Sequence, residues 1–270
     1  MKSMFDQQRK RLRVAWRTKT TIRIMRDQRT VEAVTRNVSV HGVLVFAAEP
    51  LEPGTPVQVI LDLRLPGSSS PAKDWPLEMR GTVARKVAQE GNVVAITFDS
   101  PSPDEYQKLR TAVFAQAMRL MERISEFPAF WDLTELDQLA LTTVCHEVQL
   151  GAGEQLVRLG DEATSLFLVK SGRVQLRSPF ADDVEDSEVE LAHAGQIFGE
   201  VSALLDLPHN LDIVAQTETE LLAIPRESLH FLRDHNPNLA LTLYEIFAAF
   251  MGRRLRKLTT RVFSPLNADS

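Results

Sequence analysis

Two arginines near the N-terminus and a short polar segment further along the chain are the residues best suited to bind a ligand. Arg9 and Arg13 are four residues apart, and Asn37, Ser39 and Gly42 follow about two dozen residues later. A guanidinium can bind a phosphate through two hydrogen bonds, contact the O6/N7 edge of guanine or stack on a base. Asparagine and serine can donate and accept hydrogen bonds at that edge, and glycine permits a tight turn. These residue types favour an anionic ligand that contains guanine.

The same residues resemble the pattern of the PilZ domain, which reads R-x-x-x-R followed by [D/N]-x-S-x-x-G. Every fixed position of that pattern is filled here. The resemblance extends over about residues 7–115 and includes residues 80–85 and 93–98, which match strands that usually close such barrels. It implies that cyclic di-GMP is the ligand and that the residues at the fixed positions bind it. These residues are Arg9, Arg13, Asn37, Ser39 and Gly42.

A second set of candidate residues surrounds the sequence Phe-Gly-Glu at residues 198–200. Together with the glycine turns at 151–154 and 160–161, it resembles the cyclic nucleotide-binding domain of catabolite-activator proteins and kinase regulatory subunits over about residues 128–258. In that family a short helix after Phe-Gly-Glu offers backbone N–H groups to the cyclic phosphate. The glutamate binds the ribose 2′-OH, and an arginine neutralises the phosphate. We call residues 198–212 the cassette.

The cassette departs from the family pattern at two positions. Gly199 and Glu200 match it, but His209 replaces the arginine and Asp212 replaces the usual threonine or serine. The loss of a charge-assisted hydrogen bond removes about 1.5–3 kcal/mol, and a carboxylate beside a phosphate repels it. A histidine with an unperturbed pKa of about 6.5 is mostly neutral at cytoplasmic pH. The sequence therefore predicts a degenerate cassette, with binding of a cyclic mononucleotide as the alternative.

Short runs of β-branched residues, separated by turn residues, are expected to position the first set of candidates. They predict strands at residues 20–25, 30–36, 43–47, 56–64, 77–85 and 92–98. Six strands at this spacing favour a small antiparallel barrel, with the two arginines on a basic arm in front of it. The predicted fold is mainly β with helices: a six-stranded PilZ-like β-barrel joined by a long helix to a cyclic-nucleotide-binding-type β-roll with C-terminal helices.

The long helix begins at Ser102, which is a good N-cap because Pro103 and Glu105 follow at the positions that suit it. Apolar residues at helical spacing form one stripe as far as Ile124, and Pro128 ends the helix. We therefore divide the chain into a cyclic di-GMP-binding domain at 1–101, a helical linker at 102–127 and a cyclic nucleotide-binding-like domain at 128–270.

The C-terminal domain shows a pattern of one short helix, many strands and two final helices. A helix opens at 134–137, and the final helices are predicted at 225–235 and 237–262. The strands of the predicted roll are at 147–150, 155–158, 165–170, 173–178, 188–192, 212–215 and 218–224.

Composition and charge limit the possible functions further. The 270 residues are 44% hydrophobic and 25% charged, and no run approaches the roughly 20 apolar residues that span a bilayer. The net charge is −5, although the first thirty residues hold ten Lys or Arg against two Asp. No apolar segment with a cleavage site is present at the N-terminus. We expect a cytoplasmic bacterial protein that does not enter membranes.

Catalysis and metal binding find little support in the sequence. It contains no nucleophile elbow or P-loop, and the six histidines form no H-x-H or H-x-x-x-H pair. The one cysteine, Cys145, lies in an apolar run and is expected to be a buried, inert thiol. We therefore expect no enzyme activity, no metal and no cofactor apart from the ligand.

Three functions remain open at this stage. The leading one is a cyclic di-GMP receptor that relays its state to an unidentified downstream protein. The second is a dual sensor of cyclic di-GMP and a cyclic mononucleotide. The third is a nucleic-acid-binding regulator that uses the basic arm. Specific DNA binding is not expected, because no helix-turn-helix follows the last helix. The apolar stripes of the linker and terminal helices favour a homodimer.

Overall fold

The computed structural model describes residues 12–63, 76–87, 91–177 and 190–263. The chain separates into two compact units. The first contains the residues up to Glu122 together with Gln138–Thr143, and the second contains Arg123–Asp137 and Val144–Ser270. The boundary lies within the long helix, so most of this helix belongs to the N-terminal unit and its last residues belong to the C-terminal one.

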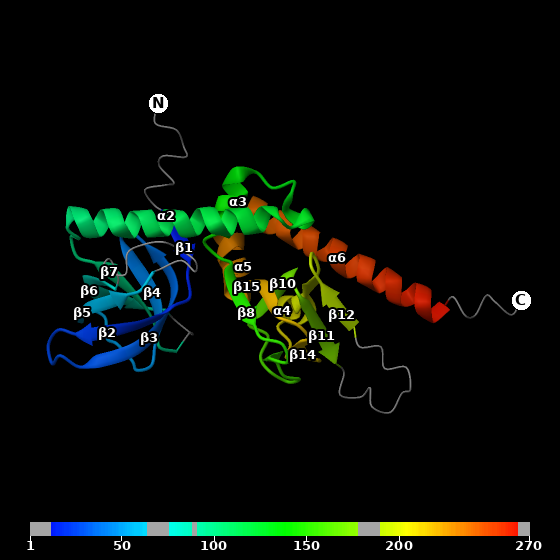
Figure 1. Ribbon diagram of the computed structural model, residues 1–270, viewed down its shortest axis with the longest axis horizontal. Coiled ribbons are helices and arrows are strands. Elements are labelled where there is room, and N and C mark those ends of the chain that lie inside the picture. The colour runs from blue at the N-terminus through cyan, green and yellow to red at the C-terminus, as the bar shows by residue number, and fades with distance from the viewer. Residues whose placement is uncertain (1–11, 64–75, 88–90, 178–189, 264–270) are drawn as a thin grey trace, which may run out of the picture. The chain divides into compact units, whose positions relative to one another are not determined.

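The N-terminal unit is a closed antiparallel barrel of six strands, which confirms the predicted fold (Figure 1). Neighbouring strands follow the order β2-β3-β4-β7-β6-β5, and β5 pairs with β2 to close the ring. A short seventh strand, β1 (Arg13–Ala15), pairs with β3. The barrel strands are β2 (Lys19–Ile24), β3 (Thr30–Ser39), β4 (Gly42–Ala47), β5 (Pro56–Leu61), β6 (Leu77–Lys86) and β7 (Val93–Phe98).

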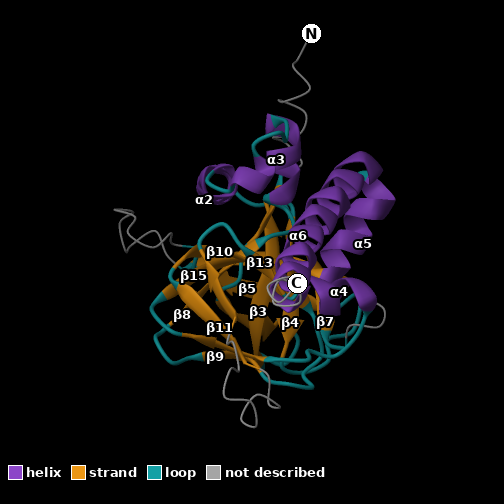
Figure 2. Ribbon diagram, turned by 90° about the vertical axis from the view of Figure 1, so that its right-hand side faces the viewer, coloured by secondary structure: helices purple, strands orange, loops and turns teal. Residues whose placement is uncertain are grey.

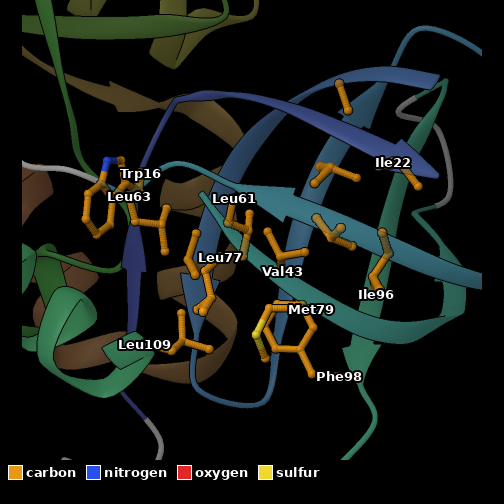
Figure 3. Packing of buried hydrophobic residues seen from close by; sticks show 14 of the residues in the cluster. Trp16, Ile22, Val43, Leu61, Leu63, Leu77, Met79, Ile96, Phe98 and Leu109 are labelled. Atoms are coloured by element: carbon orange, nitrogen blue, oxygen red, sulfur yellow. The ribbon is translucent and has the colours of Figure 1, made fainter. Parts of the chain in front are cut away.

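Alternate residues of each strand point inward and form one hydrophobic core. The burial of β2 shows this alternation, because Ile22 and Ile24 lie inside while Arg23 between them is partly exposed. Figure 3 shows Val43, Met79 and Ile96 from three other strands packed into the same core. Where a strand has no register shift, a period of two in the sequence is therefore sufficient to decide which of its faces is buried.

The helix α2 (Pro103–Ser125) contributes to the core of the barrel as well. It begins at the predicted capping box, where the Ser102 N–H donates to the Glu105 carboxylate at 2.7 Å and the Glu105 N–H donates to Ser102 Oγ at 3.2 Å. Leu109, Val113 and Ala117 from its apolar stripe belong to the hydrophobic cluster of the barrel. This part of the apolar stripe therefore packs into the hydrophobic core of the barrel.

Two elements differ from the sequence prediction in the region of the candidate site. Arg13 was expected on an arm outside the barrel, but it begins β1, because Val14 and Trp16 are buried in the core and hold this segment against β3. The strand β3 extends to Ser39 instead of ending at residue 36. A register shift between Thr35 and Asn37 accommodates the longer strand.

The C-terminal unit is a β-roll of two four-stranded sheets with helices around it. One sheet has the order β13-β10-β15-β8 and the other β12-β11-β14-β9, and side chains between them form the core. The strands are β8 (His146–Leu150), β9 (Gln155–Val157), β10 (Ser165–Ser171), β11 (Arg173–Arg177), β12 (Glu190–His193), β13 (Ile197–Phe198), β14 (Asp212–Ala215) and β15 (Thr219–Pro225).

The remaining described helices of the chain are η2 (Pro128–Phe130), α3 (Glu135–Leu141), α4 (Glu200–Leu205), α5 (Arg226–His235) and α6 (Pro237–Phe263). Figure 2 shows α5 and α6 side by side. Cys145 is buried as predicted, and burial raises the pKa of its thiol. Among the described residues, no helix combines the length and apolar character needed to cross a membrane.

Candidate functional site

The outer face of the barrel holds the first set of candidate residues. Val38 is buried in the core, so its strand neighbours Asn37 and Ser39 face the opposite side of β3. Antiparallel pairing places Arg13 of β1 directly opposite Ser39. The turn between β3 and β4 places Gly42 opposite the same serine. Four of the five predicted residues therefore lie together, and Arg9 lies outside the described residues.

Ser39 and Gly42 shape the turn that joins β3 to β4. The Ser39 hydroxyl donates to the Gly42 carbonyl oxygen at 3.1 Å and accepts from the His41 N–H at 3.3 Å. The side chain is almost fully buried. A Cβ added to Gly42 would overlap the backbone carbonyl oxygen of Ile96 on β7. Close strand approach therefore requires glycine here, and the serine hydroxyl is already engaged by the turn.

Asn37 presents an acceptor whose hydrogen-bonding capacity is not used within the described part of the chain. Its Oδ1 atom is buried and has no hydrogen-bond partner there. Buried polar atoms are nearly always hydrogen-bonded in folded proteins, so an exception requires an explanation. An N–H donor from a bound molecule would satisfy this oxygen.

Arg13 lies in an environment that disfavours its charge. Partial burial lowers the pKa of its guanidinium, and the positive charge of Arg85 lowers it further. Within the described residues, the guanidinium of neither arginine makes a hydrogen bond or an ion pair. An anion beside Arg13 would relieve this unfavourable electrostatic interaction.

Arg85 was not among the residues predicted from sequence. It follows a register shift between Val83 and Arg85 in β6, which interrupts the simple alternation of the strand. Its only sequence signal is a second cation at the end of a predicted strand. Strand order and the bulge, which place it near Arg13, are not visible in the sequence.

In the cassette, Gly199 and Glu200 occupy the turn into α4. Gly199 adopts a left-handed conformation with φ of 76°, which favours glycine. The Glu200 side chain is 2% exposed, and the Arg254 guanidinium from α6 donates to its Oε1 at 3.3 Å. One oxygen of the carboxylate expected to face a ribose is therefore engaged by the chain itself. The sequence gives no signal for this pair, because the two residues are 54 positions apart.

His209 and Asp212 also make contacts within the roll. The His209 backbone N–H donates to the Asp161 carbonyl oxygen at 2.8 Å, and desolvation lowers the pKa of the His209 ring despite the opposing effect of the Asp161 charge. The neutral form supplies no cation for a phosphate. The Asp212 carboxylate accepts from the Leu159 N–H at 2.8 Å. The Asp212 side chain therefore stabilises local structure, whereas the His209 contact is made by the backbone.

Two family models match this chain. The model described as PilZ domain matches residues 7–115, and the model described as cyclic nucleotide-binding domain matches residues 147–236. No group of three or more potential metal-ligating side chains gathers among the described residues.

Relatives match over part of the chain only. A lysophospholipase nte1 from Neurospora crassa is 32% identical over 104 residues, which are 38% of this chain and 7% of that protein. The cGMP-dependent protein kinase egl-4 from Caenorhabditis elegans is 25% identical over 123 residues, which are 45% of this chain and 15% of the kinase. The chain thus spans a small fraction of the length of either protein.

Among solved structures, the Thermus thermophilus catabolite activator protein is 30% identical, with a TM-score of 0.40. The likeness covers 50% of this chain and 61% of that one. A cyclic nucleotide-binding domain from Methylobacillus flagellatus is 19% identical with a TM-score of 0.47, covering 58% of this chain and 86% of that one. From the two matched domains we conclude that the chain contains a PilZ domain followed by a cyclic nucleotide-binding domain, a combination that supports a receptor in cyclic nucleotide signalling.

Proposed function

We propose that this protein is a bacterial cytoplasmic receptor for cyclic di-GMP, which binds on the outer face of the barrel above the hairpin of β3 and β4. The observation that supports this most strongly is the register between β1 and β3. It places Arg13 beside Ser39 and Ala15 beside Asn37, so the two halves of the PilZ pattern meet on one surface. Arg9 precedes β1 in the sequence and is proposed to bind the same ligand.

The polar groups on this surface complement the ligand. The Arg13 guanidinium can form two hydrogen bonds with a phosphate or with the O6/N7 edge of guanine, and an anion would offset the repulsion from Arg85. The Asn37 oxygen lacks a donor among the described residues, and the guanine amino group is a donor. Ser39 and Gly42 act by holding the hairpin in the shape that exposes these groups.

The cyclic nucleotide-binding domain is proposed to relay the ligand state to a downstream protein and not to bind a cyclic mononucleotide. Three features support this. Glu200 is engaged by Arg254, the pKa of His209 is lowered by desolvation, and Asp212 introduces a negative charge where the family has a hydroxyl. We propose a binding function without catalysis. A dual sensor is the alternative, because Gly199 and Glu200 are retained.

Replacing Arg13 tests the proposed site directly. Calorimetric titration of the full chain with cyclic di-GMP is expected to show binding that Arg13→Ala weakens by roughly tenfold to a hundredfold, because one charge-assisted contact is lost. Arg26→Ala is the matched control. Arg26 is exposed in the turn before β3. The seven residue steps of extended strand from Thr30 to Asn37 span about 23 Å, so Arg26 is far from the proposed site.

Equal weakening by both substitutions would show a general effect of positive charge and would contradict the proposed site. The same titration with cyclic AMP and cyclic GMP separates the leading function from the alternative. Binding of either nucleotide at micromolar concentration would establish a dual sensor.

A further inference from the structure

We infer that Arg85 of β6 binds the dinucleotide as well, and that it supplies a second cation to the site beside Arg13. This inference rests on the proposed function and adds a residue that the PilZ sequence pattern does not contain. It follows from the strand register, from the face on which Arg85 lies, and from the absence of a partner for its charge among the described residues.

Strand register places Arg85 in one row with Asn37. Asn37 lies opposite Leu44 on β4, Leu44 lies opposite Ala95 on β7, and Ala95 lies opposite Arg85 on β6. Neighbouring strands are about 4.8 Å apart, so the row spans about 14 Å between the backbones of Asn37 and Arg85. The long arginine side chain can extend over part of this distance.

The residues of this row lie on the outer face of the barrel. On β4 and β7 the residues on either side of Leu44 and Ala95 are buried in the core, whereas Leu44 and Ala95 themselves are half-buried. Arg85 is exposed. The row therefore consists of two apolar side chains between the Asn37 amide and the Arg85 guanidinium, which gives a surface suited to a flat base.

Arg85 differs from the neighbouring Lys86 in that no carboxylate among the described residues forms a salt bridge with it. The next residue, Lys86, forms a salt bridge with Glu52 at 2.6 Å. Arg85 has no such partner among the described residues, and its charge lowers the pKa of Arg13. Two like charges that interact without a counter-charge form a natural site for an anion.

The ligand class follows from this arrangement. Cyclic di-GMP carries two phosphates and two guanines, so one molecule can contact both the Arg13 and the Arg85 guanidinium. A mononucleotide has a single phosphate and offers one anionic group to two cations. The second cation, Arg85, therefore favours a dinucleotide over a mononucleotide.

The test is calorimetric titration of the full chain with cyclic di-GMP after Arg85→Ala. Loss of one charge-assisted contact is expected to weaken binding by roughly tenfold to a hundredfold. Lys86→Ala is the matched control, because it removes the same charge from the adjacent position of the same strand and is expected to change the affinity by less than about threefold. Arg85→Gln provides a second variant that retains most of the side chain, and it is expected to weaken binding as well.

The outcomes separate this inference from the proposed function. If the unmodified protein does not bind cyclic di-GMP, the proposed function fails. If the protein binds and Arg13→Ala weakens binding, but Arg85→Ala and Arg85→Gln retain full affinity, only the role of Arg85 is overturned. Equal weakening by Lys86→Ala and Arg85→Ala would also overturn it, because the loss of affinity would then come from the overall positive charge near the site and not from a contact made by Arg85.

Discussion

The outer face of the barrel and the cassette of the roll both contain residues typical of nucleotide sites, but they differ in how their polar groups are satisfied. On the barrel, the guanidinium groups of Arg13 and Arg85 and the Oδ1 atom of Asn37 have no hydrogen-bond partner among the described residues. In the cassette, Arg254 donates to one of the two carboxylate oxygens of Glu200, Oε1, and Asp212 accepts a backbone N–H.

This difference shows that a family motif can remain while its polar groups take on a structural role. A buried or partly buried polar group needs a partner, and the partner comes from either a ligand or the protein itself. Where the protein supplies this partner, a ligand can bind only after an existing contact has been displaced. The barrel face therefore has the stronger claim to be the binding site.

The largest expected effect on the barrel comes from Gly42→Ala. The added Cβ would overlap the Ile96 carbonyl oxygen, which belongs to the backbone and cannot move aside as a flexible side chain can. We expect a loss of unfolding free energy on the order of 3 kcal/mol, measured by urea denaturation.

Gly199→Ala in the cassette provides the comparison for this change. Its φ is positive, but a Cβ there would come no closer than 3.3 Å to its neighbours. We expect a loss of about 1 kcal/mol and full affinity for cyclic di-GMP. If Gly42→Ala were as stable as the unmodified protein, the close approach of β4 and β7 would be incorrect.

Arg254→Ala tests the other side of the comparison. Removing the guanidinium leaves the almost fully buried Glu200 carboxylate without this contact, and we expect a loss of roughly 1–3 kcal/mol in unfolding free energy. The affinity for cyclic di-GMP should not change, because the substitution lies in the roll. Arg253→Ala is the matched control, since Arg253 is the exposed neighbour of Arg254 on the same helix. Similar stability of both variants would mean that the Arg254 contact contributes little.

The smallest expected effect concerns the pH dependence of stability. Desolvation holds the pKa of His209 below its value in the unfolded chain, so the unfolded state binds the proton more readily. The contribution to stability is therefore fully present above the unfolded pKa and decreases as the pH falls through it toward the folded pKa. Urea denaturation at pH 7.5 and 5.5 should show a smaller acid-induced loss for His209→Gln than for the unmodified protein. An equal loss in both proteins would contradict the assignment.

Much of the fold could be predicted from the sequence because its signals are local. Alternating burial in β2 and the capping box at Ser102 depend on residues close together in the chain, and the structure confirms both. The strand β1 was missed because the basic residues around Val14 and Trp16 obscure its short apolar pattern. The strand predicted at 30–36 left Ser39 outside it, whereas Ser39 ends β3 and its side chain stabilises the turn that follows.

The site was less predictable because its remaining parts depend on contacts between distant residues. The approach of Arg85 to Arg13 requires the closed barrel and the register shift in β6. The pair of Glu200 and Arg254 joins two helices that are far apart in sequence. Neither contact follows from residue type or spacing alone.

The most direct measurement compares the two regions by titrating one preparation of the full chain separately with the ligand expected for each. Calorimetric titration with cyclic di-GMP is expected to show binding with a dissociation constant of about 1 μM or lower, which corresponds to about 8 kcal/mol of binding free energy. Titration with cyclic AMP under the same conditions should show no binding at that concentration. Binding of cyclic AMP without binding of cyclic di-GMP would contradict the account, because it would place the working site in the cassette and not on the barrel.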